Sequence, residues 1–136
     1  RLAASAMNKN TPDVDGCRGA VVNVASVAAF DGQIGQVAYA SSKGGVVSMT
    51  LVAARDLSAA GIRVNCIAPG LIDTPIYGTG EASENFKAAL GKSVLFPHRL
   101  GHAAEFASMA VELLGNSYMN GETIRVDGGI RMPPKS

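Results

Sequence analysis

The segment VAYASSKGGVVSMTLVAARDLSAAGIRVNCIAPG, residues 37–70, decides the fold of this 136-residue chain. Apolar residues recur at helical spacing from Val37 to Ala60, which predicts one long helix, and Gly61 is typical of a helix C-cap. The segment IRVNCIAP then has the continuous apolar pattern of a buried strand, and Pro69-Gly70 ends it. A helix followed directly by a buried strand is typical of α/β proteins.

The rest of the chain continues this alternation. Strands are predicted at residues 19–26 (GAVVNVAS, apolar on both faces) and 122–126, helices at 1–8, 81–90 and 103–114, and loops at 9–18, 30–36 and 71–80. Strands that alternate with helices predict an α/β fold with a parallel sheet covered by helices. Ligands of such sheets bind beyond the carboxyl ends of the strands, where Ser26 and Pro69–Thr74 are expected to lie.

Composition and charge exclude several classes of protein. Apolar residues make up 47% of the chain and charged residues 17%, which is the balance of a globular protein. The net charge is +1 without a Lys/Arg-rich block, so we expect no nucleic-acid partner. No apolar run reaches the roughly 18 residues of a membrane helix, and the two cysteines lack metal-ligand spacing. We therefore expect no membrane partner, no metal, and a reducing compartment, by default the cytoplasm.

Three residues around the first loop carry the clearest chemical pattern. Tyr39 and Lys43 are four positions apart, so they share one face of the predicted helix, and Ser26 precedes them by a short loop. A free tyrosine has a pKa of about 10, and a nearby ammonium favours its phenolate form, so such a pair can move protons near neutral pH. A serine hydroxyl can stabilise charge on a substrate oxygen. The trio suits proton transfer at an alcohol or carbonyl oxygen while a nicotinamide cofactor carries hydride.

Ser26, then twelve residues, then Tyr39-x-x-x-Lys43 is the pattern by which the chain resembles the short-chain dehydrogenase/reductase family. The resemblance implies a doubly wound, Rossmann-type NAD(P)-binding fold. It also implies that Ser26, Tyr39 and Lys43 are catalytic. Tyr39 and Lys43 would in addition hold the nicotinamide ribose.

The segment NCIAPGLIDTP, residues 65–75, is similar to the Pro-Gly stretch of the same family. That similarity implies cofactor contacts at Pro69, Gly70, Ile72 and Thr74. Ile72 would bind the nicotinamide carboxamide through its backbone, and Thr74 would bind it through its hydroxyl.

A narrower resemblance, to the type II 3-hydroxyacyl-CoA dehydrogenases of this family, covers nearly the whole chain. It is carried by residues 25–64, by FPHRLG (96–101) and by NGETIRVDGGIRM (120–132). It implies interconversion of 3-hydroxyacyl-CoA and 3-oxoacyl-CoA with NAD in fatty acid metabolism, a substrate contact at Gln33, and a homodimer or homotetramer. NADP is not excluded. An NADP-dependent 3-oxoacyl-carrier-protein reductase and a hydroxysteroid dehydrogenase stay open as alternatives.

The glycine-rich phosphate loop of the family does not occur in residues 1–136. We therefore expect residues 1–136 to be the C-terminal, catalytic half of a single domain of roughly 250 residues. By this expectation the fragment alone binds a dinucleotide poorly and is inactive. An alternative of another class is a non-catalytic nucleotide-fold protein that serves in binding or assembly.

Five further polar residues are expected to have no catalytic role. His98 and His102 lie beside a proline and at a predicted helix start, which favours solvated or capping roles. Asp31 and Asp73 are predicted to be solvated turn residues, and Asp127 to bond the backbone before a Gly-Gly turn.

Overall fold

Three parallel strands form the centre of the computed structural model, which describes residues 1–136. They are β1 (Gly19–Val24), β2 (Ile62–Pro69) and β3 (Thr123–Val126), in the spatial order β1-β2-β3. The register pairs Val21 with Val64 and Ile67 with Ile124. Parallel neighbours need a crossover between them, and the intervening helices provide it.

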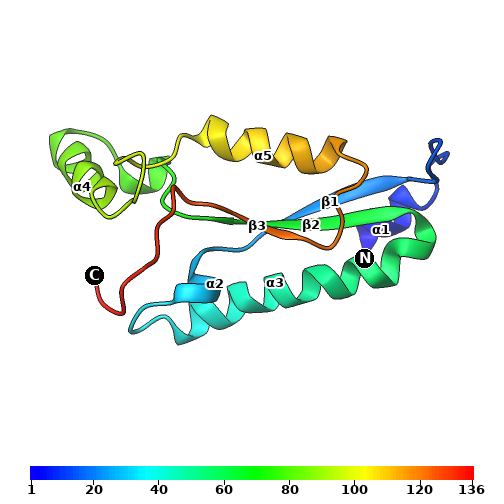
Figure 1. Ribbon diagram of the computed structural model, residues 1–136, viewed down its shortest axis with the longest axis horizontal. Coiled ribbons are helices and arrows are strands. Elements are labelled where there is room, and N and C mark those ends of the chain that lie inside the picture. The colour runs from blue at the N-terminus through cyan, green and yellow to red at the C-terminus, as the bar shows by residue number, and fades with distance from the viewer.

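Two helices cover opposite faces of this sheet (Figure 1). The long helix α3 (Val37–Leu57) lies along one face, and α5 (Ala103–Gly115) lies along the other. The remaining helices are α1 (Leu2–Met7), α2 (Ala28–Asp31), α4 (Glu81–Gly91) and the short 3₁₀ helices η1 (Ser58–Ala60) and η2 (Pro75–Tyr77). No helix combines the length and the apolarity that a membrane crossing needs. The α/β fold with a parallel sheet is confirmed.

The core is centred on β2, whose residues 62–68 are all buried. Ile62 and Val64 pack against Ala54 of α3. Arg63 is also buried, and its guanidinium donates to the carbonyls of Leu113 (2.8 Å) and Leu114 (2.7 Å) at the end of α5. Free carbonyls at a helix C-terminus need such donors, so Arg63 fixes α5 against the sheet.

The predicted helix over residues 37–60 is confirmed as α3 followed by η1, and Gly61 ends it with a φ of 70°. The strand at 62–69 and the later helices also lie where the sequence places them. The burial of β1 differs from the prediction. The sequence predicts a strand covered on both faces, but all its residues are half-buried or exposed. The reason is position, because β1 lies at one edge of the sheet that residues 1–136 form.

Candidate active site

The end of β1 is bonded to the end of β2, and this contact fixes Ser26. The N–H of Ala25 donates to the carbonyl of Ile67 (2.8 Å), and that of Val27 donates to Pro69 (3.1 Å). The Ser26 Oγ accepts from the N–H of Ala28 (3.1 Å) at the start of α2. This bond uses an acceptor site of the hydroxyl, so its hydrogen remains free to be donated to a bound oxygen.

Helix α2 packs on the first turns of α3, which carry the other two predicted catalytic residues. The contact is close, since a Cβ at Gly32 would lie 2.9 Å from the Cβ of Ala40. The sequence predicts a loop over residues 30–36, and it misses this helix, which is only four residues long.

The side chain of Lys43 contacts both the ring of Tyr39 and the end of β1. Its Nζ lies 5.9 Å from the ring centroid of Tyr39, within range of a cation–π contact. The same Nζ donates to the carbonyl of Val24 (3.3 Å), two residues before Ser26. Tyr39 is 47% exposed, so solvent reaches this residue. The structure therefore brings Tyr39 and Lys43 together beside the strand end from which Ser26 emerges.

The segment after β2 presents unused polar groups at the same edge of the sheet. Ile72 forms a parallel bridge with Gly101, in which Gly101 donates to Leu71 (2.8 Å) and Asp73 donates to Gly101 (2.8 Å). In such a bridge the N–H and C=O of Ile72 itself point away from Gly101. Those two groups and the hydroxyl of Thr74 form no hydrogen bond within the chain. They are available to an amide-bearing ligand.

Gly70 has a steric reason to be glycine. A Cβ at this position would lie 2.7 Å from the Cβ of Asp127 and 2.9 Å from its Cα. The N–H of Gly70 donates to the carbonyl of Val126 (2.9 Å), which holds the exits of β2 and β3 at that spacing. A side chain would push the Pro69–Thr74 segment out of place.

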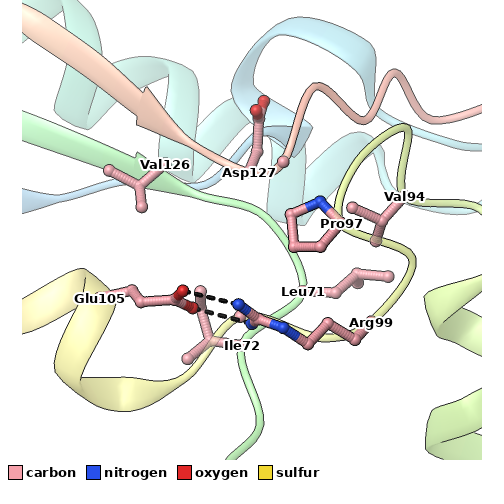
Figure 2. Close-up of a pocket in the computed structure, with 10 residues that line it drawn as sticks. Leu71, Ile72, Val94, Pro97, Arg99, Glu105, Val126 and Asp127 are labelled. Carbon is pink, nitrogen blue, oxygen red and sulfur yellow. Dashed lines mark hydrogen bonds and ion pairs between the residues drawn. The ribbon is translucent and has the colours of Figure 1, made fainter.

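A cavity of about 210 Å³ lies behind this segment, lined largely by Leu71, Ile72, Val94, Pro97 and Val126. Figure 2 shows the ion pair between Arg99 and Glu105 on one side of it, while the carboxylate of Asp127 points away. Hydrogen bonds from Arg99 (2.8 and 3.0 Å) and from the N–H of His102 (2.7 Å) lower the pKa of Glu105 to about 2. The ion pair links the first turn of α5 to the loop that precedes this helix.

Lys87 of α4 is bonded to the residue beside Thr74. Its Nζ lies 3.2 Å from Asp73 Oδ1 and 2.7 Å from Glu84 Oε1. Asp73 is thus a partner of an ion pair rather than only a solvated turn residue. Burial, and then the Asp73 carboxylate, raise the pKa of Tyr77 above its usual 10.0, which makes Tyr77 unsuited to proton transfer near neutral pH.

Gln33 is predicted to contact substrate, and its side chain here bonds the end of the chain. Its Nε2 donates to the carbonyl of Pro133 (3.0 Å), and its Oε1 accepts from the Ser136 hydroxyl (3.2 Å). The substrate contact stays a prediction.

The structure contains no group of three or more His, Cys, Asp or Glu side chains that could hold a metal ion. His98 Nδ1 lies 2.9 Å from the carbonyl of Val94, so its ring bonds the backbone.

Sequence reasoning missed Arg125 and misjudged Asp31. Asp31 is predicted to be solvated, but its side chain is only 16% exposed and forms an ion pair with Arg125 (2.9 Å). The two residues are 94 positions apart, so no local pattern links them. An aspartate directly after an apolar run, with an arginine in a later strand, is the only signal that the sequence offers.

The family model described as enoyl-(acyl carrier protein) reductase matches residues 1–131 of the chain. The chain belongs to the short-chain dehydrogenase/reductase family. The parallel sheet with its helices is accordingly the Rossmann-like fold of short-chain dehydrogenases/reductases.

Several short-chain dehydrogenases/reductases are close in sequence. The chain is 53% identical to the 3-hydroxyacyl-CoA dehydrogenase type-2 of Homo sapiens over 135 residues, which are 98% of this chain and 51% of that protein. It is 40% identical to the 3-oxoacyl-(acyl-carrier-protein) reductase FabG of Chlamydia pneumoniae over 114 residues, 82% of this chain and 45% of that protein. The crystal structure of 3-hydroxyacyl-CoA dehydrogenase type-2 from Mycobacterium avium is similar with a TM-score of 0.91 at 50% identity, over 99% of this chain and 51% of that one. The chain spans about half the length of these relatives.

Proposed function

We propose that the full-length protein is an oxidoreductase that transfers hydride between a nicotinamide cofactor and a secondary alcohol or ketone. The substrate pair is 3-hydroxyacyl-CoA and 3-oxoacyl-CoA. The observation that carries the proposal is the position of Lys43, whose ammonium lies beside the Tyr39 ring and bonds the strand end next to Ser26. The relatives described above are named as dehydrogenases and reductases of acyl substrates, which supports the substrate class.

The proposed proton chemistry belongs to Tyr39. In the oxidation direction the phenolate accepts the proton of the substrate hydroxyl, and in the reverse direction the phenol returns it to the carbonyl oxygen. The Lys43 ammonium favours the phenolate by charge attraction. Ser26 donates its free hydroxyl hydrogen to the same substrate oxygen and stabilises the charge that develops on it.

Three groups on this chain fit the carboxamide of a nicotinamide ring, and two further side chains are placed for its ribose. A carboxamide has one donor and one acceptor face, and the unused N–H and C=O of Ile72 and the Thr74 hydroxyl match them. Pro69 and Gly70 set the course of that segment, and Lys43 and Tyr39 would bind the ribose hydroxyls. When bound, the ring would accept or supply the hydride. NAD is the proposed form, by resemblance to the type II enzymes.

The proposal extends to assembly and location. The residues Val37, Met49 and Val52 of α3 expose large apolar side chains, which supports a homodimer or homotetramer. Cys17 and Cys66 are both free, in keeping with a reducing compartment such as the cytoplasm. Small-molecule substrates are the proposed ligands, with no nucleic-acid or membrane partner.

The test is Tyr39→Phe in the full-length protein. Phenylalanine keeps the ring and removes the hydroxyl, so turnover of 3-hydroxyacyl-CoA should fall by about 10²- to 10⁴-fold. Tyr118→Phe is the matched control, because Tyr118 is 98% exposed and lies in a turn far along the chain, and its variant should keep wild-type turnover. Near-wild-type hydride transfer by Tyr39→Phe would overturn the mechanism.

One relative favours a second candidate function. The 40% identity to a 3-oxoacyl-(acyl-carrier-protein) reductase supports reduction of carrier-bound substrates. NADPH is the cofactor proposed for this candidate, by resemblance to such reductases. Initial rates on acyl-CoA and acyl-carrier-protein substrates, each with NADH and NADPH, separate the two functions. The first proposal expects the highest kcat/KM for the acyl-CoA and NADH pair.

A further inference from the structure

The side chain of Arg125, on β3, contacts four residues. Its Nε donates to Asp127 Oδ2 (2.7 Å), one NH1 donates to Asp31 Oδ1 (2.9 Å), and NH2 donates to the carbonyl of Ile130 (2.9 Å). The guanidinium also lies 5.4 Å from the ring centroid of Phe30 in α2. All three guanidinium nitrogens thus bond groups of the chain itself, so Arg125 acts through other residues and not on a ligand.

Asp31, at the end of α2, receives these contacts on both oxygens. Besides Arg125, its Oδ2 accepts from the N–H of Met132 (2.6 Å). The side chains of Asp31 and Arg125 are only 16% and 20% exposed. A mostly covered ion pair whose other lone pairs are also satisfied holds its two segments firmly, because loss of one partner leaves an uncompensated charge.

The loop after α2 is bonded to the same end of the chain. The N–H of Ile34 donates to the carbonyl of Pro134 (2.9 Å), and Gln33 Nε2 donates to Pro133 (3.0 Å). Figure 1 shows the segment after β3 running down beside α2 and the loop that leads to α3. The connection from Ser26 to Tyr39 is therefore held from outside at Asp31, Gln33 and Ile34.

The connection from Ser26 to Tyr39 consists of the one-turn helix α2, a glycine-containing loop and the first residues of α3. Gly32 and Gly35 interrupt it, and Gly35 has a φ of 89°, in the region that favours glycine. Ser26 lies at one end and Tyr39 at the other, and a misplacement of about 1 Å between reacting groups can lower a rate by about 100-fold. An outside restraint on the middle of the connection therefore bears directly on the spacing of the two.

We propose that Arg125 is a positioning residue, which holds α2 and the following loop through Asp31 and so sets the placement of Ser26 relative to Tyr39. The proposal rests on the proposed function. Its physical basis, the bond between β3 and α2, stands on geometry alone, and its test therefore has one arm that does not depend on activity.

The experiment uses Arg125→Met and Asp31→Asn in the full-length protein. Methionine keeps much of the length of the arginine and loses the charge. Asparagine keeps the shape of Asp31 but turns an amide N–H₂ toward either Arg125 or the N–H of Met132. Arg131→Met is the matched control, since Arg131 also bonds Asp127 (3.3 Å) but does not contact Asp31, and its side chain is 65% exposed.

We expect kcat to fall by about 10- to 100-fold in Arg125→Met and Asp31→Asn, with the KM for the cofactor changed less than about threefold. The double variant should lose no more than the worse single variant, because the two residues act as one unit. Arg125→Lys, which keeps the charge, should recover part of the loss. Amide hydrogen exchange of residues 27–36 should speed up in both single variants, while exchange across β2 stays slow. Arg131→Met should change neither readout.

Wild-type kcat in both single variants would overturn the positioning role, and so would an equal loss in Arg131→Met. If Arg125→Met does not fold, Asp31→Asn decides the question. Absence of dehydrogenase turnover in the wild type would contradict the proposed function. In that case unchanged exchange over residues 27–36 would separately contradict the restraint itself.

Discussion

The strands β1 and β2 are neighbours made of similar residues, mostly apolar with one asparagine each, yet they differ in burial. They pair in register from Gly19–Ile62 to Val24–Ile67. Residues 62–68 of β2 are all buried, whereas none of β1 is. β2 has a strand on each edge and helices on both faces, while the outer edge of β1 pairs with no strand of residues 1–136. An apolar pattern thus indicates that a strand can be covered, and its neighbours decide whether it is.

The largest expected effect of this difference is on side-chain truncation. Ile67→Ala should lower the free energy of unfolding by about 2–5 kcal/mol, because it leaves a cavity in the interior. Val22→Ala in half-buried β1 should lower it by about 1 kcal/mol. Urea denaturation of the 136-residue chain measures both, because the edge position of β1 is that of residues 1–136. Equal losses would break the comparison.

A smaller effect is expected for the two asparagines. Asn65 is buried, donates to the carbonyl of Met119 (2.9 Å) and accepts from the N–H of Glu122 (3.1 Å). Asn65→Ala should therefore lower the free energy of unfolding by about 1–3 kcal/mol, since it leaves the buried N–H of Glu122 unpaired, while the carbonyl of Met119 keeps its bond from Arg63 (3.0 Å). Asn23, the matched control, makes one side-chain bond, to Thr50 (3.3 Å), and Asn23→Ala should cost about 0.5–1 kcal/mol. A thermal melt of each variant gives the order, and a reversed order would contradict the role of burial.

The smallest expected effect is at the surface. The pKa of Glu105, which bonds Arg99, is lowered from 4.5 to about 2. A carboxylate with a lowered pKa in the folded state stabilises the protein above its unfolded pKa, so this contribution is complete above about pH 4.5 and is lost as the pH falls towards 2. Denaturation curves between these pH values should show a shallower decline for Glu105→Gln than for the wild type. An unchanged decline would show that the Arg99–Glu105 pair contributes nothing to acid stability.

The sequence predicts the helices and strands well where a pattern extends over many residues, as in the 21-residue helix α3. Gly61 ends the 3₁₀ helix η1 that follows α3, because the left-handed conformation there favours glycine. The four-residue helix α2 was missed because one turn has no period to detect. The Tyr39–Lys43 pair follows from helical spacing, but the Asp31–Arg125 pair joins distant segments and depends on how the chain folds back. Local patterns therefore place the proposed catalytic residues, and only the tertiary structure shows which distant contacts hold them.

The bridge between Ile72 and Gly101 separates two tasks within one residue. The polar groups that Ile72 presents belong to the main chain, which every non-proline amino acid carries, while its side chain lines the cavity behind. Substitutions at position 72 can therefore reshape the cavity and leave the outward hydrogen-bonding groups unchanged. The shape of the cavity can therefore vary at this position while the main-chain N–H and C=O stay available to a ligand. Gly70, two residues earlier, has no such freedom, since any side chain there meets Asp127.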